Sequence, residues 1–427
     1  NKLRNYYKRM DKFIIKGGVP LKGKVKISGA KNAVLPIMAA TIIVSGKYRL
    51  KNVPQLRDTF TMKRLLEMVG ATVHYENNIM DIDTSGCDTP IAPYELVKTM
   101  RASFYVLGPL LSRFNYAEVS LPGGCAWGPR PVNYHLQAME ALGAEVDLSD
   151  GMIIAKGKLK GAQINFEQSS VGATGNALMA AVNSAGTTII KNAAQEPEIE
   201  ALCHFLEKMG ADIQGIGTEE ITIYGQKKLN ADIEYSVIPD RIEAGTFLIA
   251  GASTFGDITV VNVNPGHLDI LLKYLTEAGF NLDVQDKSIR ISPSQNYVNP
   301  VNMTTEIYPG FPTDLQAQWM ALMAIANGES KITEEIYTDR FTHIAELTRF
   351  GAQIQLSGNK AEIQGINKLK GAPVMSTDIR ASASLIIAAL AAEGKSSISR
   401  IYHIDRGYDN IENKFNLLGA KINRVRE

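Results

Sequence analysis

Cys125 lies in a segment that favours chemistry over packing. The stretch VSLPGGCAWGPRPVNYH, residues 119–135, places this thiol directly after two glycines and five residues before Arg130. Glycine and proline build turns, whereas a packing cysteine would be expected on a strand or helix that faces the core. Because a nearby guanidinium stabilises the thiolate and lowers the pKa of a thiol, we expect Cys125 to be reactive.

Several charged residues stand where apolar helices are expected to begin. Asp240, Asp314 and Asp378 are each most simply explained as helix N-caps. Cations are harder to explain there, because a positive charge opposes the helix dipole. Acidic neighbours or an anionic ligand would account for the four of them, which are Lys31 in SGAKNA, Arg101 in KTMRAS, Arg241 in PDRIEA and Arg380 in TDIRASAS.

A second set of polar residues follows the expected strands. In YHIDRGYDN, the residues His403, Asp405 and Arg406 stand beside a turn glycine. If this set and the helix-start cations face one cleft, the cleft suits a doubly anionic, phosphorylated substrate. The members of the second set are Arg57, the Cys125–Arg130 loop, Glu196, His267, Arg340 and Arg406.

The elements that must position these residues recur six times. An amphipathic helix ending in glycine, followed by a short alternating strand, repeats at intervals of 67 to 73 residues. A glycine at this point suits the left-handed cap that ends a helix. The recurring glycines are Gly70, Gly143, Gly210, Gly279, Gly351 and Gly419.

A second helix, apolar nearly all round and rich in small residues, recurs between these copies, as in NALMAAVNSAG and SLIIAALAA. A helix of this kind is expected to be buried. Six such units exceed one core, so an α/β protein with three units in each of two domains is predicted. A repeat scaffold that only binds a ligand is the alternative at this point.

The composition excludes several classes of protein. Lys and Arg number 45 against 44 Asp and Glu, so there is no bulk field for nucleic acid or an anionic membrane. The three cysteines do not space as a disulfide scaffold or metal site, and Cys203 is expected to pack. Few cysteines fit a reducing compartment, so we expect a cytoplasmic protein with no metal and no cofactor. Met10 is a candidate natural start, with residues 1–9 an N-terminal tail or an added remnant.

Eight motifs, in order from about Met10 to the C-terminus, carry a resemblance to a known family. They are SGAKNA, KTMRAS, SLPGGCAWGPRPV, SVGAT, FPTDLQAQ, RFTH, TDIRASASL and YHIDRGY. Together they closely resemble the bacterial UDP-N-acetylglucosamine 1-carboxyvinyltransferases of the enolpyruvyl transferase family. The resemblance implies the inside-out α/β barrel with βαβαββ-like repeats. It implies one domain over 31–238 with the Cys125 loop, and a second over 10–30 plus 239–427 with Asp314.

The implied reaction moves the enolpyruvyl group of phosphoenolpyruvate to the 3′-hydroxyl of UDP-N-acetylglucosamine and releases phosphate. It proceeds by addition and elimination through a tetrahedral phospho-ketal, and it is the first committed step of peptidoglycan precursor synthesis. The resemblance implies that Cys125 protonates C3 of phosphoenolpyruvate, forms a covalent adduct at C2, and is the target of fosfomycin. It sits on a loop that closes over substrate.

The resemblance also implies roles for residues that match the motifs. Lys31, Arg130 and Arg406 would hold the phosphate and carboxylate of phosphoenolpyruvate, with Arg101 in support, and Asp314 would accept the 3′-hydroxyl proton. Asn32 would contact the sugar. The other implied substrate-binding residues are Arg340, Asp378 and Arg380 in the cleft and, for uridine diphosphate, Pro131, Val132, Asn133, Tyr134, Ser170, Val171, Gly172 and Ile336.

Two departures from the family pattern concern the nucleotide. Family members often carry Asp at the position of Asn133, and some carry Lys at the position of Gln168. A shikimate-pathway enolpyruvyl transferase is the nearest alternative, although that family lacks the PGGC loop. A catalytically silent paralogue that binds the nucleotide sugar is the other alternative.

Overall fold

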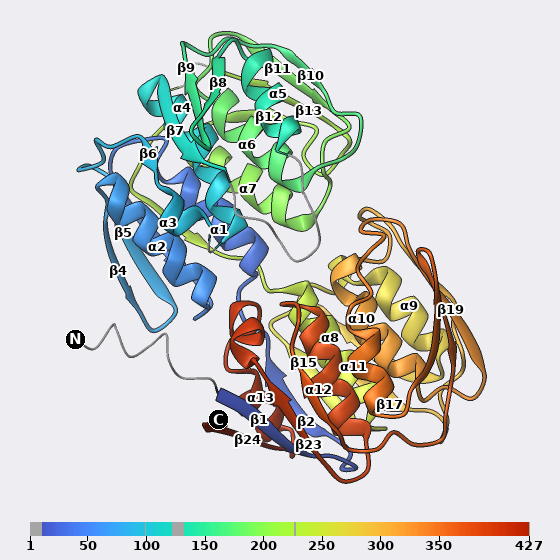
Figure 1. The fold of residues 1–427 in the computed structure, drawn as a ribbon. Coiled ribbons are helices and arrows are strands. Elements are labelled where there is room, and N and C mark those ends of the chain that lie inside the picture. Colours follow the sequence, from blue (N-terminus) through green and yellow to red (C-terminus); the bar gives the residue numbers. More distant parts are fainter. Residues whose placement is uncertain (1–10, 99, 122–131, 226–227, 427) are drawn as a thin grey trace. The chain divides into compact units, whose positions relative to one another are not determined.

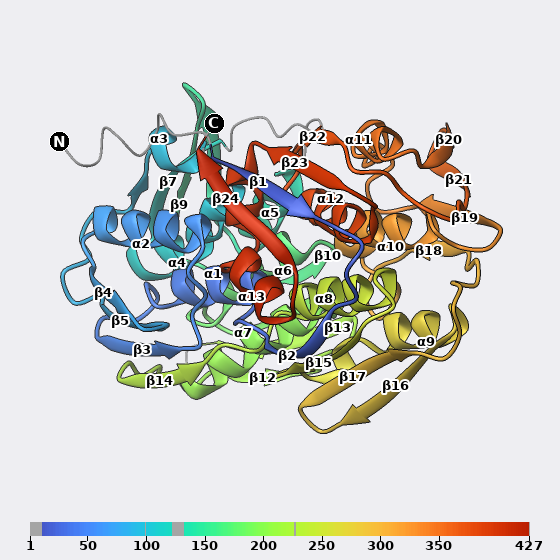
Figure 2. The same ribbon diagram turned by 90° about the horizontal axis from the view of Figure 1, so that it is seen from below.

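The computed structural model describes residues 11–98, 100–121, 132–225 and 228–426 (Figures 1 and 2). Cys125, Arg130 and Pro131 therefore lie outside the described residues. The chain divides into two compact units. We call Gly29–Ile238 the N-terminal unit, and Asn1–Ser28 with Pro239–Glu427 the C-terminal unit. Each unit has its own apolar core.

Three four-stranded sheets make up each unit, and all six share one pattern. The first strand of each order given below is parallel to the second, and the other pairs are antiparallel. The orders in the N-terminal unit are β14 (Ile233–Ser236), β3 (Lys47–Lys51), β5 (Ile79–Asp83), β4 (Thr72–Glu76); β6 (Ile91–Ala92), β7 (Tyr116–Ser120), β9 (Met152–Lys156), β8 (Glu145–Ser149); and β10 (Gln163–Asn165), β11 (Thr187–Lys191), β13 (Glu220–Tyr224), β12 (Asp212–Gln214). Those in the C-terminal unit are β2 (Lys22–Lys26), β15 (Asp257–Val261), β17 (Ser288–Pro293), β16 (Phe280–Gln285); β18 (Met303–Thr305), β19 (Glu329–Glu334), β21 (Lys360–Gln364), β20 (Gln353–Ser357); and β22 (Pro373–Met375), β23 (Lys395–Ser399), β1 (Asp11–Lys16), β24 (Lys421–Arg426).

The N-terminal strands β1 and β2 belong to sheets of the C-terminal unit. β1 lies between β23 and β24, with Phe13 opposite Ile398 and Ile15 opposite Ile422 (Figure 2). The side chains of Phe13 and Ile15 are fully buried, so they anchor the start of the chain in that core. β2 pairs in parallel with β15.

Six apolar helices fill the two cores, as the sequence predicted. In the C-terminal unit α8, α10 and α12 pack against one another (Figure 1), and in the N-terminal unit α4 packs against α6. Small residues permit this approach: a Cβ on Gly108 would fall 2.4 Å from the carbonyl oxygen of Asn176. The six helices are α1 (Lys31–Ala40), α4 (Leu107–Phe114), α6 (Val171–Ala181), α8 (Arg241–Ser253), α10 (Thr313–Met323) and α12 (Ala381–Ala391).

The second of these helices begins differently from the expectation. Arg101 starts a 3₁₀ helix, η2 (Arg101–Val106), and the α-helix begins only at Leu107. Pro109 has no N–H to donate to the carbonyl of Tyr105, and its ring would clash with that carbonyl. The α-helix therefore starts just before the proline, where a missing donor is tolerated.

The amphipathic helices end as predicted. All six glycines that follow them adopt the left-handed conformation, with φ between 90° and 107°. These helices are α2 (Arg57–Val69), α5 (Asn133–Ala141), α7 (Pro197–Lys208), α9 (Asp269–Glu277), α11 (Ile344–Arg349) and α13 (Ile411–Leu417). Among the residues that the structure describes, the remaining short helices are α3 (Tyr94–Val97), η3 (Pro265–His267) and η4 (Ile401–Arg406).

Each unit buries one histidine beside its inner helices. In the C-terminal unit Nε2 of His343 lies 3.2 Å from the sulfur of Met320, and in the N-terminal unit Nδ1 of His135 accepts a hydrogen bond of 2.8 Å from Asn176. Burial lowers the pKa of each imidazole to about 3, so both are neutral near pH 7.

The burial of these two histidines should make the folded protein less stable in mild acid. The unfolded chain takes up a proton at each histidine below its ordinary pKa of about 6.5, whereas the folded chain does not until about pH 3. Each histidine thus lowers the free energy of unfolding by about 2 kcal/mol between pH 7 and pH 5. Urea unfolding of His343→Gln at both pH values should show a pH dependence smaller by that amount.

His74→Gln is the matched control, because it makes the same substitution at a side chain that is 72% exposed. A wild-type pH dependence in His343→Gln would contradict the assignment.

Candidate active site

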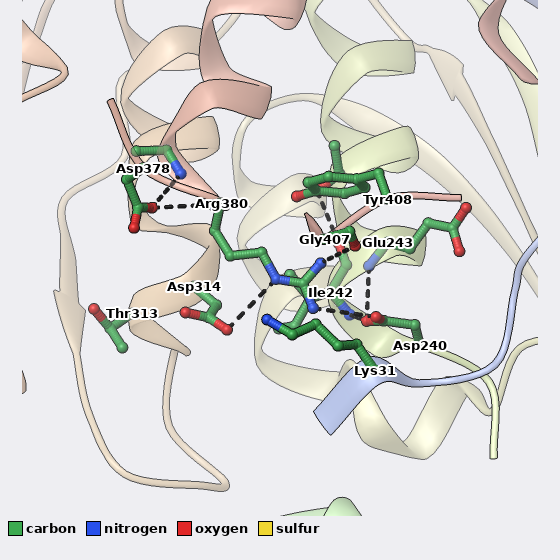
Figure 3. A network of polar contacts seen from close by, with 12 residues as sticks. Lys31, Asp240, Ile242, Glu243, Thr313, Asp314, Asp378, Arg380, Gly407 and Tyr408 are labelled. Atoms are coloured by element: carbon green, nitrogen blue, oxygen red, sulfur yellow. Dashed lines mark hydrogen bonds and ion pairs between the residues drawn. The ribbon is translucent and has the colours of Figure 1, made fainter. Parts of the chain in front are cut away.

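Among the predicted site residues that the structure describes, Arg380 is the most deeply buried. Its guanidinium donates to the carboxylate of Asp240 at 3.1 Å and to the carbonyl oxygen of Gly407 at 2.9 Å, and its Nε lies 3.7 Å from Asp314 Oδ2 (Figure 3). It also lies 5.0 Å over the ring of Tyr408. Burial alone would lower the pKa of Arg380, but the neighbouring carboxylates outweigh it and raise the pKa.

Arg340 forms the second half of this network. It donates to Asp314 Oδ1 at 2.8 Å and to the hydroxyl of Thr313 at 3.1 Å, and its other terminal nitrogen lies 3.5 Å from Asp378. Here too burial opposes the charge, while Asp314 and Asp378 raise the pKa of the guanidinium. Asp314 is thus flanked by two arginines, and its side chain is 25% exposed, the most open of these carboxylates.

The carboxylates of this network also fix the starts of inner helices. Asp240 Oδ1 accepts from the N–H groups of Ile242 and Glu243 at the start of α8, and Asp378 Oδ1 accepts from those of Arg380 and Ala381 at the start of α12. The N-cap prediction is therefore correct for Asp240. Asp378 lies two residues before Arg380, the N-cap of α12, although it bonds N–H groups there. The N-cap prediction is wrong for Asp314, because Pro312 is the N-cap of α10. Asp240 and Asp378 each bond helix N–H groups and contact an arginine at once, which fixes the guanidinium groups relative to the helix ends.

Arg406 closes η4, one residue before the Gly407 carbonyl that binds Arg380. Its neighbour Asp405 is already engaged, because both of its oxygens accept from Arg424 of β24, at 2.6 and 3.0 Å. Asp405 therefore links η4 to the C-terminal strand β24.

In the N-terminal unit, Lys31 opens α1 and has an acidic partner. Its ammonium lies 3.1 Å from Asp58 in the first turn of α2, and both side chains are nearly buried. Together with Arg380, this supports acidic neighbours as the explanation for cations at helix starts. Arg241 instead lies 5.4 Å over the ring of Tyr308. Asn32 follows Lys31 in α1, and Arg101 starts η2.

Two helix starts that were predicted to bind uridine diphosphate come together in the same unit. Val132 is the N-cap of α5, so Asn133 and Tyr134 lie in its first turn. Ser170 caps α6 by accepting from the N–H of Ala173, and Val171 and Gly172 follow it. The two helices are in contact: a Cβ on Gly172 would fall 3.0 Å from the His135 ring.

Among the residues that depart from the family pattern, Asn133 and Gln168 are both exposed. Ile336 and Arg340 lie between β19 and α11, where the N–H of Ile336 donates to Glu334. Cys125, Arg130 and Pro131 lie outside the described residues. The sequence analysis missed Asp58, Thr313 and Glu334. Of these, only Asp58 could have been found from local sequence, because it is an acidic residue in the first turn of a helix.

Residues 11–98, 100–121, 132–225 and 228–426 contain no group of three or more His, Cys, Asp or Glu that could hold a metal ion. No helix in the same ranges is both long and apolar enough to cross a membrane.

Known proteins resemble this chain over nearly its whole length. It is 54% identical over 419 residues to the UDP-N-acetylglucosamine 1-carboxyvinyltransferase of Chlorobium phaeovibrioides (strain DSM 265 / 1930), covering 97% of this chain and 98% of that protein. It is 53% identical to the protein of that name in Geotalea uraniireducens (strain Rf4), covering 98% of this chain and all of that protein.

Solved structures share the fold. The enolpyruvyl transferase NikO from Streptomyces tendae superposes with a TM-score of 0.88 at 26% identity, over 98% of this chain and 100% of that one. EPSP synthase from Acinetobacter baumannii gives a TM-score of 0.75 at 18% identity, over 97% and 100%. The family described as EPSP synthase (3-phosphoshikimate 1-carboxyvinyltransferase) matches residues 15–415. The chain therefore belongs to this family of enolpyruvyl (carboxyvinyl) transferases.

Proposed function

We propose that this enzyme transfers the enolpyruvyl group of phosphoenolpyruvate to the 3′-hydroxyl of UDP-N-acetylglucosamine and releases inorganic phosphate. The observation that carries this proposal is the identity of more than 50%, over nearly the full length, to proteins named for that reaction. The family match alone does not choose between acceptors, because its description names a shikimate enzyme. The product would commit its sugar nucleotide to peptidoglycan synthesis, in the cytoplasm.

Asp314 is the group that we assign to the acceptor hydroxyl. A proton leaves the 3′-oxygen as that oxygen bonds to C2 of phosphoenolpyruvate, while C3 gains a proton, so the adduct is a tetrahedral phospho-ketal. Loss of phosphate from C2 and of a proton from C3 then restores the vinyl group. Asp314 suits the first proton transfer because two flanking guanidinium groups favour its ionised form and its side chain is open to solvent.

Cations and helix starts are assigned to the two anionic substrates. We propose Lys31, Arg130 and Arg406 for the phosphate and carboxylate of phosphoenolpyruvate, with Arg101 in support. The adjacent starts of α5 and α6, which carry Asn133 and Ser170, offer free N–H groups to a diphosphate. The other assigned substrate-binding residues are Asn32, Pro131, Val132, Tyr134, Val171, Gly172, Ile336, Arg340, Asp378 and Arg380.

Cys125 is the proposed acid at C3. This role rests on the PGGC loop and on the cation at Arg130. The other two thiols are poor candidates, because burial raises the pKa of Cys203 to about 12 and also raises that of Cys87. Both are free and buried.

The acceptor decides between the candidate functions. Phosphate release from phosphoenolpyruvate should require UDP-N-acetylglucosamine and should not occur with shikimate 3-phosphate. Release with shikimate 3-phosphate alone would identify the shikimate enzyme. Absence of release with either acceptor, together with a thermal shift on adding UDP-N-acetylglucosamine, would identify a silent binding protein.

Asp314→Asn should lower turnover by at least ~100-fold, because the amide keeps the shape of the side chain but cannot accept the proton. The control is Asp339→Asn, which alters an exposed carboxylate next to Arg340 and should leave turnover near wild type. Steady-state phosphate release measures both, and a thermal melt checks folding. Near-normal turnover in folded Asp314→Asn would rule out this role.

Fosfomycin, a phosphonate epoxide, should form one adduct, on Cys125, and faster with UDP-N-acetylglucosamine present. Cys125→Asp should escape modification yet stay active, because a carboxylic acid can still donate a proton, whereas Cys125→Ser should be much weaker. Peptide mass mapping locates the adduct. Modification of Cys203, or full sensitivity of Cys125→Asp, would overturn the assignment.

A further inference from the structure

Glu334 is a carboxylate that none of the proposed roles uses, although it is fully buried. It is the last residue of β19, and its strand neighbour in register is Thr305, the last residue of β18. These strands are parallel, so their carboxyl ends meet at one edge of the sheet. Glu334 therefore stands at the point where two loops leave the sheet.

Four hydrogen bonds converge on this carboxylate. Oε1 accepts from the hydroxyl of Thr305 at 2.8 Å and from the N–H groups of Ile336 and Tyr337, both at 2.9 Å. Oε2 accepts from the hydroxyl of Thr313 at 2.9 Å. These bonds satisfy both oxygens of the buried carboxylate, and each donor is held in place by its bond to it.

The bond to Thr313 connects Glu334 with the proposed catalytic groups. The Thr313 hydroxyl donates to Glu334 and accepts from Arg340 at 3.1 Å. Arg340 binds Asp314 at 2.8 Å through the same nitrogen. The order Glu334, Thr313, Arg340, Asp314 is thus one continuous chain of hydrogen bonds at the start of α10.

We propose that Glu334 is a positioning residue of the transfer reaction. Oε1 holds the main chain at Ile336, which is a proposed nucleotide contact. Oε2 holds Thr313, and Thr313 in turn contacts Arg340, the partner of Asp314. The carboxylate thereby keeps the proposed nucleotide contact and the proposed base in a fixed relation. This inference rests on the proposed function, because the role of Asp314 does.

The two oxygens can be tested separately. In Glu334→Gln the carbonyl oxygen is expected to stay with its three donors, so the amide nitrogen faces Thr313 and that acceptor is lost. Thr313→Val removes the same bond from the other side. Both variants should lower kcat by roughly 10-fold or more, since a small misplacement of a catalytic group slows reaction strongly. The KM for UDP-N-acetylglucosamine should stay near wild type.

The double variant Glu334→Gln/Thr313→Val separates the loss of this one bond from a general loss of stability. Both changes break the Glu334–Thr313 bond, and Thr313→Val also removes an acceptor of Arg340, so the double variant should lose no more kcat than Thr313→Val alone. Multiplied losses would overturn the connection. Thr305→Val is the matched control: it deletes another hydroxyl donor to the same carboxylate, one that lies on β18 and not on α10, and should keep kcat. An equal loss of kcat in Thr305→Val would indicate a purely structural role.

A measurement without turnover separates this inference from the proposed function. In Glu334→Ala, hydrogen exchange of a peptide spanning Ile336 and Tyr337 should speed up relative to wild type, and in Thr313→Val it should not. Unchanged exchange in Glu334→Ala would overturn the inference about the loop. If wild-type protein released no phosphate with UDP-N-acetylglucosamine, the proposed function and the catalytic part of the inference would fall, and the exchange result would still decide what Glu334 holds.

Discussion

Two guanidinium groups kept away from water determine the arrangement of the C-terminal unit. Removing Arg340 and Arg380 from solvent is unfavourable unless each finds charged partners with good geometry. The partners are Asp240, Asp314 and Asp378, which stand near the starts of α8, α10 and α12. The helices cannot slide relative to one another without separating a buried charge from its partner, so the arginines fix how the three inner helices meet.

The same constraint shapes the chemistry. Asp240 and Asp378 each accept from helix N–H groups and also contact an arginine, so the main chain fixes their positions. Asp314 lies in the first turn of α10, whose N-cap is Pro312, and is the most exposed of the three. A charged carboxylate that is oriented by two arginines but still reachable is what proton abstraction from a hydroxyl requires. Of the three, Asp314 is therefore the carboxylate whose position best fits the proposed proton transfer.

Features set by local sequence could be predicted, and features set by distant partners could not. The six glycine caps and six apolar helices follow from residue type and spacing within one unit, and all were found. Pro109 was also visible in the sequence, but its effect on the helix start at Leu107 was missed. The Lys31–Asp58 pair joins two helices, and Glu334 accepts from β18, from the start of α10 and from the loop after β19, so only the folded chain brings these groups together. The roles assigned from motifs stay predictions.

The placement of β1 also has a consequence for how the chain is made. A ribosome delivers Phe13 and Ile15 first, but their partners Ile398 and Ile422 emerge almost last. The whole of Gly29–Ile238 is synthesised in between and contains its own sheets and core, so it can fold while β1 and β2 wait unpaired. The apolar residues of β1 must therefore remain free of wrong pairing until β23 and β24 have been made. In nascent chains of this enzyme, β1 should therefore need protection from wrong pairing, either by a chaperone or by rapid synthesis of the rest of the chain.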